Sequence, residues 1–310
     1  MTAAIGVDPQ RSRSSIVLRE SSGLGTQISV VGDGRRRLIP NAWGGGATED
    51  PWDPEFLRGI RGRLSQYLGV DAGYRITLAV PLEKRVLEVC AAAGLTGVGC
   101  VDPADALLCR WLSEPVDGAW RGRVSVAVVG ETRTWLASYQ VNADQSQVRR
   151  LPGARSVPYG SGAWCAELRR MVLDRCGEGA VDPVAVLDGV YEFGAALDPV
   201  QPTQWRGPLA ERMFTPLRLS RAEMLAWPSV REVTGALREL EGQVVVGGVG
   251  AIWPFYDRAW RSDAPEHDLA VGAAWWPELA PYFSGLPVPA AEPATFTGQD
   301  EGTAPWLRSS

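Results

Sequence analysis

The 310-residue chain can bury one large hydrophobic core or two medium ones, and its 45% hydrophobic and 22% charged residues are typical of a globular protein. A formal net charge of -5 provides no basic excess that would draw the whole molecule to nucleic acid or to an anionic membrane. The sequence has no apolar run of about 18 residues and no secretory leader, so we expect a cytoplasmic protein without a membrane partner.

The residue types that carry common catalytic and metal chemistry are scarce. Lys84 is the only lysine and His267 the only histidine. The five cysteines show neither metal-type spacing nor the density of a disulfide framework, and Cys90, Cys109 and Cys165 fall in apolar stretches typical of a core. A zinc site and a serine-histidine triad are therefore not expected.

The first part of the chain predicts a three-stranded meander followed by alternating helices and strands. Short β-branched runs separated by Gly, Ser and Pro indicate strands. Apolar residues at helical spacing indicate helices, with Gly94 as a C-cap and Asp102 as an N-cap. The expected strands are Ala4–Val7, Ser15–Leu18, Gln27–Val31, Arg75–Val80 and Val98–Val101, and the expected helices are 53–68, 82–93 and 103–111. Gly32–Gly34 predicts a tight turn, and Arg35–Arg37 a charged sheet edge.

The same pattern then starts again. Strands are expected at Arg123–Val129, Thr134–Val141, Gln147–Leu151 and Gln243–Val246, and helices at 162–173, at 220–240, from about Pro254, and at 268–276. Ser220 and Glu223 have the spacing of a capping box. The repeated order predicts two α/β lobes, 1–115 and 116–283, followed by a proline-rich mobile tail, 284–310.

Five segments in order resemble the Hsp70/actin ATPase superfamily, and Hsp70 in particular. They are Ile5–Asp8 with Ser12 and Ser14–Val17; Ile76–Pro81 continuing through Ala93–Leu95 to Asp102–Ala106; Leu219–Met224; Val244–Gly248 with Pro254; and His267–Ala274. The resemblance covers about residues 5–276 and rests on the order and spacing of the motifs together. It implies a minimal two-lobed fold, a duplicated ribonuclease H-like α/β fold, without the substrate-binding domain of Hsp70.

The resemblance also implies a nucleotide site. In this superfamily glycine hairpins present backbone N–H groups to the phosphates of ATP, and carboxylates hold Mg²⁺ and orient water. Carried over to this chain, the nucleotide-binding candidates are Asp8, Ser12, Gly130, Gly160, Gly247 and Gly248. Asp8 is the candidate metal ligand, and Asp8 and Glu131 are the catalytic candidates if the site is active.

The chain departs from the superfamily pattern where ATP chemistry is concentrated. Pro9–Arg11 replaces the residues that wrap the first phosphate, and proline removes an N–H donor there. The second phosphate motif has lost its aspartate and retains only Gly130. No lysine precedes the Ile76 strand, and the adenine-clamping motif has no counterpart between Asp174 and Pro216. Losing one stabilising element costs on the order of 10² to 10³ in rate, so several losses predict a pseudoenzyme without a bound cofactor.

The function expected from this sequence is a protein- or peptide-binding chaperone or scaffold module. The alternative is an ATPase with a non-standard Mg-ATP site, and a third hypothesis is a subunit of an actin-like polymer. Trp260, Trp275 and Trp276 are the candidate partner-binding residues, because tryptophan is a common anchor and adjacent helix residues face different directions. The same tryptophans are also explained as core filling. The sequence leaves the oligomeric state and the identity of the partner open.

Overall fold

The computed structural model describes residues 2–10, 13–22, 25–31, 39–40, 58, 74–80, 84–95, 97–114, 121–142, 147–176 and 183–284. The chain divides into two compact units. The first includes Met1–Cys109 and Ala270–Ala280, and the second comprises Arg110–Leu269 and Pro281–Leu286. The protein is a mixed α/β structure, as the sequence predicts, and its strands form both parallel and antiparallel pairs.

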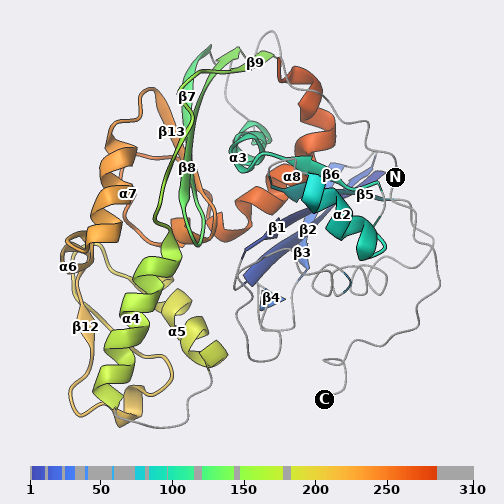
Figure 1. Cartoon of the computed structure of the whole chain (residues 1–310). Coiled ribbons are helices and arrows are strands. Elements are labelled where there is room, and N and C mark those ends of the chain that lie inside the picture. Colours follow the sequence, from blue (N-terminus) through green and yellow to red (C-terminus); the bar gives the residue numbers. More distant parts are fainter. Residues whose placement is uncertain are drawn as a thin grey trace. The chain divides into compact units, whose positions relative to one another are not determined.

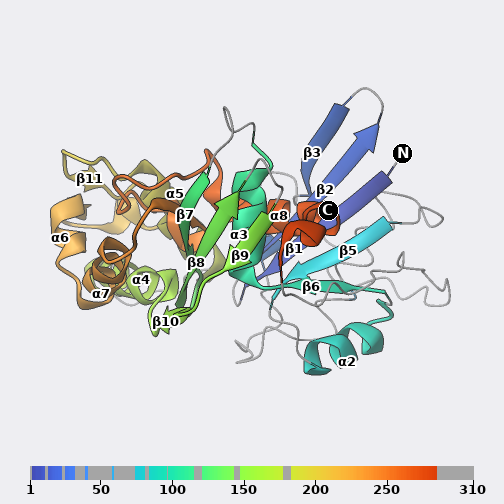
Figure 2. The same cartoon turned by 90° about the horizontal axis from the view of Figure 1, so that it is seen from above.

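The sheet of the first unit begins with the predicted meander (Figures 1 and 2). Its strand order is β3-β2-β1-β5-β6, with β4 beside β2; β1 is antiparallel to β2 and parallel to β5. The strands are β1 (Thr2–Pro9), β2 (Arg13–Ser22), β3 (Gly25–Val31), β4 (Ile39–Pro40), β5 (Tyr74–Ala79) and β6 (Gly99–Val101). The side chains of Ile5, Ile16 and Ile76 are fully buried, so the centre of this sheet forms a core.

Helices of the first unit begin and end where the sequence indicates. Helix α2 (Lys84–Ala92) is followed by Gly94, whose φ of 74° suits a glycine C-cap. Helix α3 (Pro103–Leu112) begins after Asp102, whose Oδ1 accepts a 2.9 Å hydrogen bond from the Ala104 N–H. Asp102 is thus a helix cap.

Helix α8 (Asp268–Leu279) packs closely within the first unit from Ala270 onward. A Cβ built on Gly6 of β1 would lie 1.7 Å from the Ala270 carbonyl oxygen, and one on Gly272 would lie 1.7 Å from the Ala106 carbonyl oxygen. Only glycine fits at these two contacts, because any side chain would overlap backbone atoms. The two glycines therefore set how closely α8 approaches β1 and α3.

The sheet of the second unit repeats the arrangement of the first. Its order is β10-β8-β7-β13, with β9 also on β8; β7 is antiparallel to β8 and parallel to β13. The strands are β7 (Arg121–Val129), β8 (Thr134–Asn142), β9 (Gln147–Arg150), β10 (Arg155–Val157) and β13 (Gln243–Gly247). A single parallel bridge between Val245 and Trp260 lies beside β13, at the position that β6 takes beside β5.

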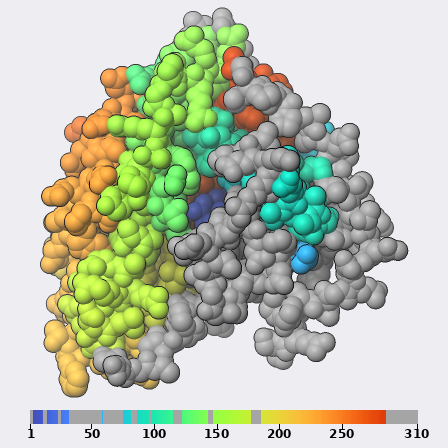
Figure 3. Space-filling view, viewed as in Figure 1, coloured from blue at the N-terminus to red at the C-terminus, as the bar shows by residue number. Residues whose placement is uncertain are grey.

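The helices of the second unit pack around a core rich in aromatic residues. They are α4 (Ser161–Cys176), α5 (Pro183–Ala196), α6 (Arg221–Leu225) and α7 (Pro228–Arg238), with the short strands β11 (Thr203–Gln204) and β12 (Arg218–Leu219) between α5 and α6. Trp164, Trp205 and Trp253 are almost completely buried. Helix α4 forms part of the yellow-green surface in Figure 3. It carries exposed ion pairs of Arg170 with Glu167 and Asp174.

Two predicted helices of the second unit are wrong. The stretch 220–240 forms two helices, because Pro228 cannot continue the first and instead begins the second. The predicted Ser220–Glu223 capping box is present. No α-helix begins at Pro254. The chain instead forms the short 3₁₀ turn η3 (Val249–Ile252) and continues without a helix to Trp260. The Trp260 N–H donates a hydrogen bond to the Val244 carbonyl.

Several sequence predictions lie outside the described residues. They are Ser12, the Gly32–Gly34 turn, the Arg35–Arg37 edge, the 53–68 helix apart from position 58, and the tail beyond Ser284. No helix in the described part of the chain has the length and apolar character needed to cross a membrane.

Candidate functional site

The predicted phosphate turn of the second unit joins β7 to β8. The Gly130 N–H donates a 3.1 Å hydrogen bond to the Arg133 carbonyl, which closes the turn. A Cβ on Gly130 would lie 2.7 Å from the Trp135 ring, so the indole packs directly on the backbone. The predicted glycine is needed here for close packing of an aromatic ring.

The beginning of helix α4 is hydrogen bonded to this turn. The Ser161 N–H donates to the Gly130 carbonyl at 2.9 Å, and the Gly162 N–H donates to the Glu131 carbonyl at 2.8 Å. A Cβ on Gly160 would lie 2.3 Å from the Gly130 carbonyl oxygen, so glycine is required for this approach. The first N–H groups of a helix can bind an anion. Here the N–H groups of Ser161 and Gly162 instead donate hydrogen bonds to carbonyls of the same unit.

The end of β13 lies beside the same turn. Gly247 pairs with Val128, and a Cβ on Gly248 would lie 2.9 Å from the Val129 carbonyl oxygen. Gly248 has a φ of 93°, which favours glycine, and its N–H donates a 3.0 Å hydrogen bond to the Pro265 carbonyl. The structure therefore brings Gly130, Gly160 and Gly248 to one end of the sheet. The nearby N–H groups already donate hydrogen bonds to backbone carbonyls of the same unit; they belong to Gly130, Ser161, Gly162 and Gly248.

Asp8 lies in the buried part of β1 in the first unit. It is 1% exposed and lies opposite Ser15 in β2, and its Oδ1 accepts a 2.7 Å hydrogen bond from Gln10 Nε2. Within the described ranges, no group of three His, Cys, Asp or Glu side chains is arranged to hold a metal ion. The role of Asp8 as a metal ligand stays a prediction. The Glu131 side chain is half-buried, and its catalytic role is likewise a prediction.

The three candidate partner-binding tryptophans have different surroundings. Trp276 is buried, whereas Trp275 and Trp260 are half-buried. The Trp275 ring lies 4.1 Å from the guanidinium carbon of Arg19, within the first unit. The Trp260 Nε1 donates a 3.2 Å hydrogen bond to Glu114 Oε2 in the second unit. Each of these rings therefore has contacts inside the chain, and partner binding by them stays a prediction.

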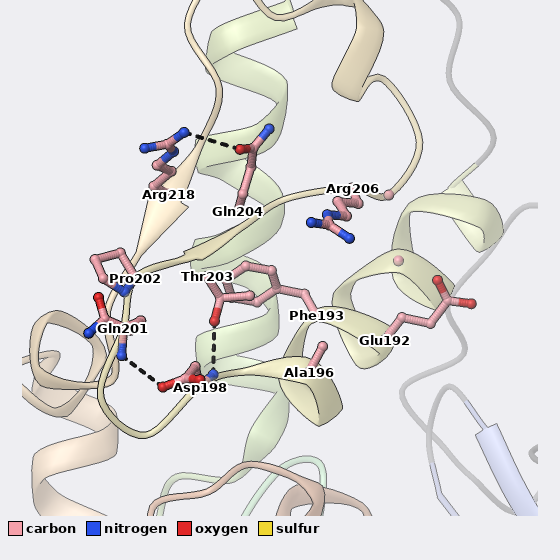
Figure 4. Close-up of a pocket in the computed structure, with 12 residues that line it drawn as sticks. Glu192, Phe193, Ala196, Asp198, Gln201, Pro202, Thr203, Gln204, Arg206 and Arg218 are labelled. Atoms are coloured by element: carbon pink, nitrogen blue, oxygen red, sulfur yellow. Dashed lines mark hydrogen bonds between the residues drawn. The ribbon is translucent and has the colours of Figure 1, made fainter.

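Sequence reasoning did not find a cavity of about 590 Å³ in the second unit (Figure 4). It lies between helix α5 and the segment that carries β11 and β12. Its lining combines apolar and charged side chains: Phe193, Ala196 and Glu192 from α5, Thr203 and Gln204 from β11, Arg218 from β12, and Asp198 and Arg206 from the loops. No periodic pattern marks these residues, because the cavity forms only when α5 packs against Trp205.

The charged groups of the cavity differ in how far they are already satisfied. Asp198 Oδ1 accepts 2.7 Å hydrogen bonds from the N–H groups of Val200 and Gln201, which lower the pKa of this carboxyl. Arg218 Nη2 is 3.4 Å from Gln204 Oε1. The Arg206 side chain is exposed and makes no hydrogen bond or ion pair with the residues the structure describes. Arg206 is therefore the cation of this cavity with the greatest capacity for a ligand.

Asp268 is a buried carboxyl in the second unit. Its Oδ1 accepts from Ser262 Oγ at 2.6 Å and lies 3.2 Å from Arg110 Nε, whereas Oδ2 is buried without a hydrogen-bond partner in the described structure. Burial raises the pKa of this carboxyl to about 7, although Ser262 and Arg110 act in the opposite direction and the charges of Glu266 and Glu114 add to the rise.

The thiols of Cys90 and Cys100 are poor nucleophiles. All five cysteines are free. Burial raises the thiol pKa of Cys90 to about 11 and that of Cys100 to about 12. A thiol with such a pKa stays protonated near neutral pH and is a poor nucleophile. The prediction that these cysteines are small core residues holds for Cys90, Cys109 and Cys165, which are buried.

Comparison with known proteins provides no family for this chain: no protein-family model matches it, and no curated protein matches it. Its function must therefore be inferred from the two features above, the closed glycine turns and the cavity beside α5.

Proposed function

We infer that the chain is an Hsp70/actin-like pseudo-ATPase that binds a protein or peptide without turning over nucleotide. The repeated sheet order supports the two-lobed ancestry, since each unit has an antiparallel meander whose first strand pairs in parallel with a later strand. A duplicated α/β arrangement of this kind is what the motif order of the sequence implies.

One observation carries the loss of ATP chemistry. The N–H groups of Gly130, Ser161, Gly162 and Gly248 all donate to carbonyls of their own unit. Binding phosphate through these donors requires breaking hydrogen bonds whose carbonyl acceptors would then be left unpaired. An unpaired buried polar group costs about 1 to 3 kcal/mol. For the buried acceptors Gly130 and Pro265, this cost offsets much of the free energy that the N–H groups of Ser161 and Gly248 would gain from a phosphate.

The cavity beside α5 supports the binding part of the proposal. Its volume falls in the range of about 300 to 1,000 Å³ that is usual for ligand sites, and it combines an apolar floor with separate polar groups. Asp8 and the clustered glycines are the features that favour the alternative, an active ATPase with an unusual site.

A combined assay tests both parts of the proposal. We expect the protein to suppress the light scattering of a thermally aggregating reporter enzyme to the same extent with and without Mg-ATP. We also expect phosphate release from Mg-ATP to equal the buffer background. Phosphate release that disappears in Asp8→Ala would establish the alternative, and unchanged aggregation at excess protein would refute protein binding. Serum albumin at the same concentration controls for crowding.

A further inference from the structure

The hairpin of β11 and β12 has an open edge beside the cavity. The Trp205 N–H donates to the Leu217 carbonyl at 2.8 Å, so Trp205 and Leu217 form a hydrogen-bonded pair. Bonded and non-bonded pairs alternate in an antiparallel ladder, and the next pair is Gln204 with Arg218. The main-chain N–H and C=O of Gln204 therefore point away from β12, toward the side of β11 where no described strand pairs.

The cavity is held in shape by a buried tryptophan. Trp205 is 1% exposed, its Nε1 donates a 3.1 Å hydrogen bond to the Pro208 carbonyl, and its ring centroid lies 6.0 Å from that of Phe193. A Cβ on Gly189 would approach the Trp205 ring to 3.0 Å, and one on Gly207 to 2.5 Å. Helix α5 and the loop after β11 therefore close tightly on this ring, and a ligand would meet a preformed wall.

Of the two arginines in the cavity, Arg206 has no hydrogen-bond or ion-pair partner among the described residues, whereas Arg218 contacts Gln204. The Asp198 carboxylate already accepts two backbone N–H groups. Figure 4 shows the Arg206 guanidinium directed toward the space beside Phe193 and Thr203, whereas the Glu192 carboxylate points away from them. A guanidinium fork fits a carboxylate with two parallel hydrogen bonds, which makes an acidic side chain the matching ligand group.

We propose that the cavity beside α5 binds an extended peptide segment, pairing its main chain with Gln204 and placing an aspartate or glutamate side chain on Arg206. The peptide adds to the open edge of β11, and the residue facing the cavity provides the carboxylate. This proposal rests on the proposed peptide-binding function and names the ligand chemistry of that function.

Fluorescence anisotropy with designed peptides tests this proposal. The probes are labelled peptides Gly-Ser-Val-Thr-X-Val-Thr-Ser-Gly with Glu, Gln or Lys at X. We expect the Glu peptide to bind about ten-fold more tightly than the Gln peptide, since a charged hydrogen-bonded pair is typically worth about that factor. Arg206→Gln should remove this preference, and Glu192→Gln, a matched change of an exposed cavity residue, should preserve it.

Further arms distinguish the possible outcomes. Equal binding of the Glu and Gln peptides, no measurable binding of either, or an unchanged preference in Arg206→Gln would overturn the proposal. Competition by free succinate at the concentration of the peptide would show a small-molecule carboxylate site and would also overturn it. If these results occur while aggregation of the reporter enzyme is still suppressed, the ligand assignment fails and the proposed function stands.

Discussion

Asp268→Asn is expected to make the free energy of unfolding less dependent on pH. The wild-type protein should lose stability as the pH rises from about 4 to about 8, and the Asn variant should not show this loss. The carboxyl has a raised pKa of about 7 in the folded chain, against an ordinary value of 3.8. Between these values the unfolded chain loses the proton and the folded chain retains it, so the free energy of unfolding falls as the pH rises and levels off above about 7. The difference in pKa corresponds to about 4 kcal/mol.

The geometry explains why Asn should be tolerated at this position. Asp268 is 1% exposed, and the carbonyl oxygen of Asn can accept the hydrogen bond that Ser262 now donates to Oδ1. The amide is close in shape to the carboxyl and carries no charge to bury. Arg110 retains its ion pair with Glu114, so the substitution does not leave the guanidinium without an anion.

Urea denaturation at a series of pH values, followed by tryptophan fluorescence, measures this effect. The quantity to compare is the difference in unfolding free energy between wild type and Asp268→Asn at each pH. Asp263→Asn, the same change at an exposed position nearby, is the matched control. A difference that does not change between about pH 4 and pH 8 would show that Asp268 titrates normally.

Removing Glu278 is expected to destabilise the first unit more than removing its partner Arg19. Arg19 is 2% exposed on the side chain, whereas Glu278 is 49% exposed, and the two are 2.5 Å apart. In Glu278→Ala the buried guanidinium loses its carboxylate and keeps only the Trp275 ring, while its Nε and Nη1 already lack partners in the described structure. Leaving a buried polar group without its partner costs about 1 to 3 kcal/mol, and the half-exposed position of Glu278 lets water reduce this cost.

In Arg19→Met the remaining carboxylate of Glu278 is hydrated, and the methionine fills the volume of the arginine stem. The expected change is within about 1 kcal/mol, because a buried ion pair contributes little over a hydrophobic side chain of similar size. A double-mutant cycle measured by chemical denaturation checks the asymmetry, since Glu278→Ala should be nearly silent in the Arg19→Met background. A larger loss in Arg19→Met than in Glu278→Ala would contradict this account.

The strands and caps were predictable because they depend on neighbours in sequence. The β-branched runs of β1, β2 and β7 and the Ser220–Glu223 capping box are local signals, and the structure contains all of them. The error at Pro228 also has a local cause. The apolar spacing on both sides of Pro228 is helical and predicted one helix, but proline cannot continue a helix, so a second helix begins there.

The hydrogen bonds of the glycine turns, the cavity beside α5 and the Arg19–Glu278 ion pair were not predictable from the sequence, because each depends on residues far apart in the chain. The glycines of the predicted phosphate motifs can be read from the sequence, but whether nearby N–H groups are available depends on carbonyls such as that of Gly130, which accepts from the Ser161 N–H. The cavity requires Trp205 to pack against Gly189, and the Arg19–Glu278 pair spans 259 positions. Sequence motifs therefore predicted where a nucleotide site would lie, but they could not predict whether its N–H donors are available.

Thermal unfolding in the presence of Mg-ATP or Mg-ADP tests the central claim that the glycine turns are closed to phosphate. A ligand at about 100 times its Kd adds about 2.7 kcal/mol to the unfolding free energy, which raises the melting temperature by several degrees. We predict no change in the melting temperature at millimolar nucleotide. A rise of several degrees that disappears in Asp8→Ala would contradict the claim and establish a working nucleotide site.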